Sequence, residues 1–93
     1  MKEILDNINI KFQEGKINFF FYILSEHKPI GLEDNYIFNN PEDLENFYNL
    51  DKKKFMKKMR RLYNPLRYKG KKKEDQKVHS IMQEISMKLN DLD

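Results

Sequence analysis

KKKFMKKMRRLYNPLRYKGKKK, the segment from Lys52 to Lys73, carries twelve of the eighteen basic side chains of this 93-residue chain and no acidic one. The rest of the chain holds all fifteen acidic side chains against six basic ones, so positive charge is concentrated in this segment. Within it, Phe55, Met59 and Leu62 recur at the spacing of one helix face. The segment therefore predicts an amphipathic helix with one apolar and one cationic side.

This basic helix is expected over about residues 52–63. Asn64 and Pro65 end it, because a residue before proline is displaced from the α region and proline lacks the N–H that a helix interior needs. A basic loop follows. The side of the helix opposite the apolar residues is expected to carry Lys53, Lys57, Lys58, Arg60 and Arg61.

A second amphipathic helix is predicted over about residues 74–92. Its apolar stripe has the same width as that of the basic helix and leaves Met87 outside. Two such helices joined by a short loop should pack antiparallel, with Phe55 and Met59 against Ile85 and Leu89. The stripe consists of Val78, Ile81, Met82, Ile85, Leu89 and Leu92.

A short helix is predicted before the basic one, over about residues 41–49. Asn40 can cap it with its side-chain oxygen, Pro41 suits the first helical position, and acidic residues follow in the first turn. Asp51 is expected to cap the basic helix. The inward side chains of the short helix are predicted to be Leu44, Phe47 and Tyr48.

Residues 1–40 form an aromatic-rich segment that fits two structures. The apolar positions from Ile4 to Phe12 suit a helix face, which we favour slightly, but positions 8–12 and 17–23 around a Gly15 loop also suit a β-hairpin. In either case the apolar run 19–24 should form the centre of the core. Pro29 and Gly31 mark a turn, and one short strand is expected at 36–38.

Size and composition predict a single, mainly α domain over 1–93 that is not an enzyme and has no cofactor. Without cysteine there is no disulfide or thiolate site, and His27 and His79 lack carboxylates at ligand spacing, so no metal site is expected. No run approaches the ~20 apolar residues of a membrane span and no signal peptide opens the chain, which predicts a cytoplasmic protein with no membrane partner. The absence of Ala, Thr and Trp beside abundant Lys and Asn suggests an AT-rich genome, as in a phage or parasite.

From residue 41 onward the order of elements resembles a J domain, the DnaJ-like co-chaperone module. In that family a basic helix ends in Lys-Tyr-His-Pro-Asp followed by a basic residue. Here Tyr63, Pro65 and Arg67 match, whereas Asn64 and Leu66 replace the His and Asp. The last helix resembles the family's Phe-x-x-Ile-x-x-Ala-Tyr-x-x-Leu run at Met82, Ile85, Leu89 and Asp91, with His79 and Ser86 where aromatics are usual.

The resemblance implies a J-like helical hairpin over 41–93. In J domains the His-Pro-Asp tripeptide couples docking to ATP hydrolysis by the heat-shock ATPase, so its replacement implies binding or regulation without stimulation. The partner would be an acidic protein surface, such as a heat-shock ATPase or a J protein. The predicted partner-binding residues are Lys53, Lys57, Lys58, Arg60, Arg61, Asn64, Pro65, Leu66, Arg67, Tyr68, Lys69, Lys71, Lys72 and Lys73.

Two other interpretations of the basic residues stay open. Lys and Arg at this density also suit the phosphates of RNA or DNA, with Tyr68 as the better candidate for base stacking and Tyr63 a core residue. The same residues can also form a solvated face without a partner, balanced by acidic residues elsewhere in the chain. Asn64 and Pro65 can equally serve only to stop the helix, with Leu66 tucked against the hairpin.

Overall fold

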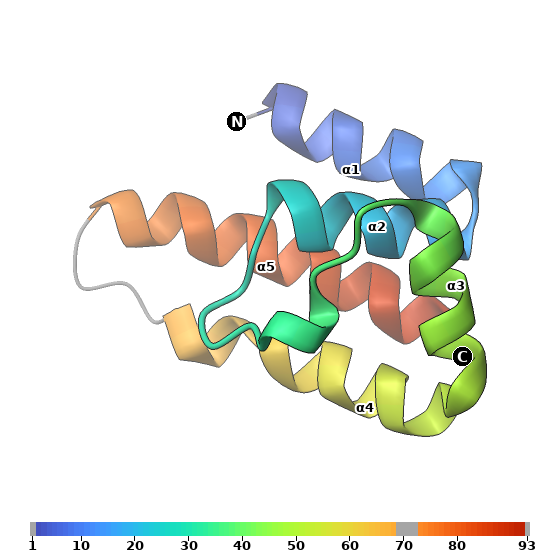
Figure 1. Cartoon of the computed structure of the whole chain (residues 1–93). Helices are drawn as coiled ribbons and strands as arrows, with labels where there is room; N and C mark the ends of the chain where they lie inside the picture. The colour runs from blue at the N-terminus through green and yellow to red at the C-terminus, as the bar shows by residue number, and fades with distance from the viewer. Residues whose placement is uncertain (1, 69–72, 93) are drawn as a thin grey trace.

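The computed structural model describes residues 2–68 and 73–92, without side-chain positions for 68 and 73–75. The described part is a compact all-α fold in which α1, α2 and α5 run side by side, α3 crosses one end, and α4 lies along α5 (Figure 1). The elements are α1 (Lys2–Glu14), α2 (Lys16–Glu26), the 3-10 turn η1 (Asp34–Tyr36), α3 (Pro41–Leu50), α4 (Lys52–Leu62), the 3-10 turn η2 (Pro65–Tyr68) and α5 (Lys73–Asp91).

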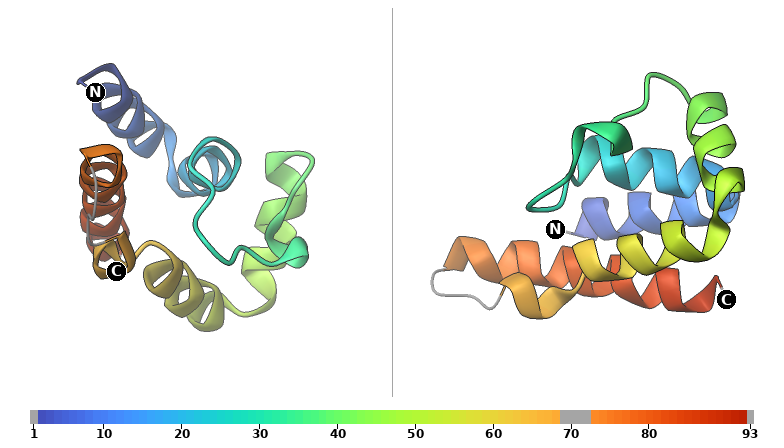
Figure 2. Two further views of the ribbon diagram at one scale, coloured as in Figure 1. Left: turned by 90° about the vertical axis from the view of Figure 1, so that its left-hand side faces the viewer. Right: turned by 60° about the horizontal axis from the view of Figure 1, so that its bottom comes forward.

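Helices α4 and α5 form the predicted antiparallel hairpin. Figure 2 shows the two helices in contact and running in opposite directions. The apolar stripe of α5 lies inward as expected, with Met82, Ile85 and Leu89 buried and Met87 56% exposed. The hairpin and the short helix α3 therefore confirm the arrangement predicted for residues 41–92.

One hydrophobic core joins all five α-helices. Ile8 of α1, Phe20 of α2, Leu44 of α3, Phe55 of α4 and Leu89 of α5 belong to the same buried cluster. The run 19–24 contributes four buried side chains, which places it in the core as expected. The N-terminal segment 1–40 and the hairpin thus share their apolar interior, and neither half buries its apolar face alone.

The N-terminal segment is a pair of helices, and the β-hairpin alternative does not occur. In a strand Ile8 and Ile10 would share one face, but Ile8 is fully buried while Ile10 is 54% exposed, as the period of a helix requires. Gly15 alone separates α1 from α2, with φ of 124°, a conformation that glycine adopts without steric cost. Phe12 and Phe19 then meet edge to face with centroids 5.3 Å apart.

The strand expected at residues 36–38 is wrong. The 3-10 turn η1 ends at Tyr36, and residues 37 and 38 follow it without regular structure. In this turn the N–H of Tyr36 donates to the carbonyl of Glu33 (2.9 Å), and that of Ile37 donates to the carbonyl of Asp34 (3.1 Å). A strand would need a partner strand for its backbone groups, and residues 2–68 and 73–92 contain none. Tyr36 instead turns inward and packs against Phe47 of α3, with ring centroids 5.2 Å apart.

Both predicted helix caps are present. The side-chain oxygen of Asn40 accepts from the N–H of Asp43 (2.9 Å), and that of Asp51 accepts from the N–H of Lys54 (3.0 Å). Asp51 also separates α3 from α4, because it is the only residue between the two helices.

Replacing Asp51 by alanine is expected to lower the free energy of unfolding by about 1 kcal/mol. The change removes one acceptor from the first turn of α4 and an acidic charge at a helix start whose next three residues are lysines. Chemical denaturation of the full chain measures the difference. Asp51→Asn keeps the acceptor and should cost clearly less, whereas equal losses for both variants would mean that the charge and not the cap matters.

Candidate partner-binding surface

Helix α4 separates its side chains sharply between core and solvent. Phe55, Met56, Met59 and Leu62 are buried, because they face α5 and the aromatic centre of the core. On the outside, Lys53, Lys57 and Arg61 are exposed. We call the outward set the cationic face of α4; it consists of Lys53, Lys57, Lys58, Arg60 and Arg61.

Two members of the cationic face are partly covered by other elements. Lys58 pairs with the carboxylate of Glu33, which comes from the connection between α2 and α3. Arg60 is half-buried and lines a hollow near Tyr48 and Lys16. An acidic residue of the chain thus reaches Lys58, while Lys53, Lys57 and Arg61 remain open to solvent.

The corner after α4 combines buried and exposed residues. Tyr63 is fully buried, and its hydroxyl donates to the carbonyl of Ile23 in α2 (2.8 Å). The side-chain oxygen of Asn64 accepts from the N–H of Leu66 (3.0 Å), and the Leu66 side chain is 65% exposed. Leu66 is therefore not tucked against the hairpin. His79 Nδ1 lies 3.3 Å from the carbonyl oxygen of Pro65, which ties α5 to this corner.

The basic loop is described only in part. Arg67 is exposed and lies beside Gly31, with its Nη2 3.4 Å from where a Cβ on Gly31 would stand. Tyr68 ends η2 and Lys73 begins α5, but their side chains lie outside the described structure. Lys69, Lys71 and Lys72 were also predicted to bind a partner, and they lie outside the described residues.

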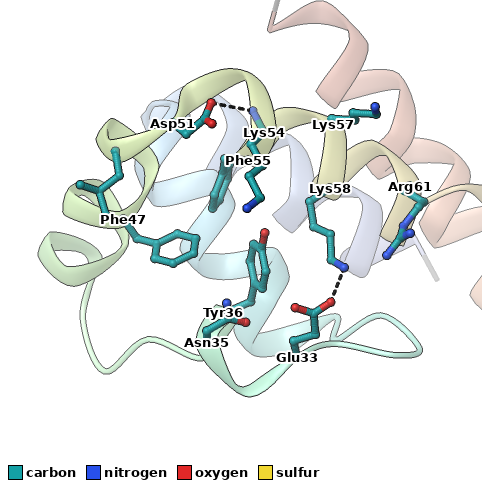
Figure 3. A pocket seen from close by; sticks show the side chains of 11 residues that line it. Glu33, Asn35, Tyr36, Phe47, Asp51, Lys54, Phe55, Lys57, Lys58 and Arg61 are labelled. Carbon is teal, nitrogen blue, oxygen red and sulfur yellow. Dashed lines mark hydrogen bonds and ion pairs between the residues drawn. The ribbon is translucent and has the colours of Figure 1, made fainter.

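A groove of about 630 Å³ runs beside the cationic face, between α4, the end of α3 and η1. The almost fully buried rings of Tyr36 and Phe55 belong to its lining, and Glu33 and Lys58 face each other across one side (Figure 3). Its volume lies in the range of ligand-binding clefts. The lining consists of Glu33, Asn35, Tyr36, Phe47, Leu50, Asp51, Lys54, Phe55, Lys57, Lys58 and Arg61.

The electrostatics of the groove are visible in two ionisable groups. The hydrogen bond from Lys58 lowers the pKa of the Glu33 carboxyl, and the positive charges of Lys58, Arg61 and Lys54 lower it further. Burial raises the pKa of the Tyr36 hydroxyl, and the negative charge of Glu33 adds to this effect. Lys54, Lys58 and Arg61 therefore place positive charge around the Glu33 carboxylate, although the groove lining also includes Asp51.

The Glu33 carboxyl is expected to titrate below its ordinary pKa. Because the pKa is lowered in the folded state, the stabilisation from the pair with Lys58 is present above the unfolded-state pKa. It is lost as pH falls through the folded-state value. A carboxyl-carbon NMR titration of the full chain measures this. Lys58→Met should move the pKa back up, and an unchanged value in that variant would mean that the pair does not form in solution.

The histidines are engaged with neighbouring groups. His27 Nε2 lies 3.2 Å from the Tyr22 hydroxyl, and burial lowers the pKa of its imidazole.

Within the ranges that the structure describes, no three His, Cys, Asp or Glu side chains come together as metal ligands. Among the helices of those ranges, none is both long and apolar enough to cross a bilayer.

Several groove residues could not be nominated from the sequence. Lys54 was not among the predicted binding residues, although it belongs to the same helix. Glu33, Asn35 and Leu50 come from segments outside α4. Leu50 is 82% exposed, and it was not among the side chains predicted to lie inward on the short helix.

No protein-family model, no curated protein and no solved structure matches the chain. The resemblance to a J domain therefore depends on the residues around Tyr63, on the pattern of the last helix and on the order of the helices alone.

Proposed function

We propose that this chain is a small, non-catalytic binding and regulatory protein that contacts an acidic protein partner through the cationic face of α4. The proposal is supported by the amphipathic character of α4, which has buried apolar side chains on one side and exposed cations on the other. Its apolar side packs into the core, whereas Lys53, Lys57 and Arg61 lie outside the core and remain exposed. Charges of one sign held in a row on a rigid helix steer and orient an oppositely charged protein.

The groove supports a protein partner over a nucleic acid. A phosphate backbone needs cations, whereas the apolar wall formed by Phe47 and Leu50 would remain unused against it. Base stacking needs an accessible ring face, and Phe55 and Tyr36 are only 1% and 4% exposed. A protein segment can present carboxylates and apolar side chains together.

The J-like features suggest which class of partner to test first. We propose that the corner at Tyr63–Arg67 occupies the position of the J-domain loop, and that the partner is a heat-shock ATPase or a J protein. At this corner Leu66 is exposed where the family has Asp, and Asn64 already bonds the backbone of Leu66. Without the His and Asp of the tripeptide, we expect binding without stimulation of ATP hydrolysis.

Steady-state ATP turnover by a heat-shock ATPase, with and without a competent J protein, tests this function. The chain alone should leave turnover at the basal rate. Added in excess to the mixture with the J protein, it should lower the stimulated rate by competition. Strong stimulation by the chain alone would contradict the inferred role of Asn64 and Leu66.

Nucleic acid is the second candidate, and one observation favours it. Arg61 and Arg67 both line a hollow at Gly31, so the cationic surface continues from α4 past the corner. If phosphates are the target, affinity for duplex DNA or RNA should fall steeply with salt, with a slope of several units in log K against log salt. Absence of binding at low salt would remove this candidate.

A further inference from the structure

The groove beside α4 has an apolar side and a cationic side. Phe47 and Leu50 of α3 provide apolar surface, and Leu50 is 82% exposed, although leucine usually lies inside. Lys54, Lys58 and Arg61 follow one another along α4 at intervals of three and four residues, so they share one face of the helix. From Lys54 to Arg61 this row of cations extends for about 10 Å.

A row of cations of that length fits a partner with several carboxylates better than one small anion. A single phosphate or carboxylate would reach one or two of these side chains and leave the others unpaired. A fully charged ligand would leave the apolar wall beside the row without a contact. A partner segment with one or two apolar side chains between its carboxylates would contact this wall as well as the cations. The groove is also larger than one side chain needs, at about 630 Å³.

Glu33 shows where a carboxylate sits in this groove. Its side chain is 52% exposed on the connection between α2 and α3, and it reaches across to Lys58, whose side chain is only 16% exposed. Because the Glu33 end of the pair is exposed to solvent, the pair contributes little to folding, and Glu33 can be displaced at little cost. A carboxylate of a partner would therefore compete with Glu33 for Lys58.

We propose that the groove is the docking site for an acidic segment of the partner that inserts an apolar side chain between Phe47 and Leu50, and that Glu33 competes with a carboxylate of this segment for Lys58. The inference rests on the proposed function, because it assumes an acidic protein partner. It adds the chemistry of the contacted segment and an internal competitor that weakens its binding.

Two fluorescein-labelled model peptides test the proposal against the full chain by fluorescence anisotropy. One consists of Glu and Asp residues around a central Leu-Phe pair, and the other has Ser-Gly in place of that pair. The peptide with the apolar pair should bind about three- to tenfold more tightly. Leu50→Ser should abolish this difference without changing the affinity of the purely acidic peptide. Because Leu50 is exposed, the variant should fold normally.

Glu33→Gln gives an independent measurement. Removal of the competing carboxylate should increase the affinity for both peptides by about two- to fivefold, which is the range expected for one exposed charge pair. Glu42→Gln, on the first turn of α3 and outside the groove lining, is the matched control and should change neither affinity.

The outcomes separate this inference from the proposed function. Equal affinities of the two peptides, a difference that survives Leu50→Ser, or no gain with Glu33→Gln would overturn the docking site while acidic ligands still bind. If neither peptide binds at low salt, the proposed function fails as well. Tighter binding of duplex DNA than of either peptide, unchanged by Leu50→Ser, would also overturn the docking site, in favour of phosphates.

Discussion

Replacement of Phe55 by alanine should destabilise the protein by about 3 to 5 kcal/mol, a loss at the upper end of the range for a single truncation. The Phe55 side chain is 1% exposed and stands at the centre of the aromatic cluster. Its ring lies 5.1 Å from that of Phe20, 5.3 Å from Tyr48 and 6.0 Å from Tyr36, centroid to centroid. One cavity at this point therefore loosens α2, α3, η1 and α4 together.

The expected loss is a large part of the total stability of a small domain, about 5 to 15 kcal/mol. Denaturant titration followed by circular dichroism measures it, with Phe55→Leu as a conservative variant that should lose much less. Met87→Ala is the matched control on α5, because that side chain is 56% exposed, and it should change stability by less than about 0.5 kcal/mol. A loss below about 1 kcal/mol for Phe55→Ala would mean that α4 is not held by its apolar side.

Reversal of two exposed charges on α4 should have the largest effect on binding. The double variant Lys57→Glu and Arg61→Glu replaces attraction by repulsion along the cationic face. The binding free energy of the acidic peptide with the Leu-Phe pair should become less favourable by about 2 to 3 kcal/mol, which is a loss of affinity of roughly 30- to 150-fold at low salt. The effect should shrink as salt is added, because exposed charges are screened. Both side chains point to solvent, so thermal unfolding should hardly change.

A variant with the same change in net charge provides the control. Lys2→Glu with Lys11→Glu places the new charges on α1, which packs on α2 and α5 and does not line the groove. This variant should bind the peptide with nearly the original affinity. Equal losses in both double variants would show that the total charge of the chain, and not the cationic face, governs binding. Unfolding of the α4 variant would show that the face is structural.

Local patterns were sufficient to predict the C-terminal half of the fold. The spacing of Phe55, Met59 and Leu62, the stop at Asn64 and Pro65, and the caps at Asn40 and Asp51 all act within a few residues. The structure places each of them as expected. The N-terminal segment was harder, because apolar residues at 8–12 satisfy both periods until burial separates Ile8 from Ile10.

Only the part of the candidate site that lies on α4 was predicted from the sequence. The cationic face of α4 follows from periodicity, but the opposite wall of the groove depends on how the connection between α2 and α3 returns to α4. Nothing near Glu33 in the sequence indicates a contact with Lys58, 25 residues later. The prediction of a strand at 36–38 was wrong for a similar reason, because the packing of Tyr36 against Phe47 is a tertiary contact that the local sequence does not indicate.

An NMR titration of the isotope-labelled chain with the acidic peptide that carries the Leu-Phe pair tests the two-sided character of α4 most directly. The amide shifts should change most at Lys53, Lys54, Lys57, Lys58 and Arg61 and at the groove wall around Leu50, and little along α1. Changes centred on α1 and the outer side of α5, with α4 unaffected, would contradict a cationic face on α4 that binds acidic partners.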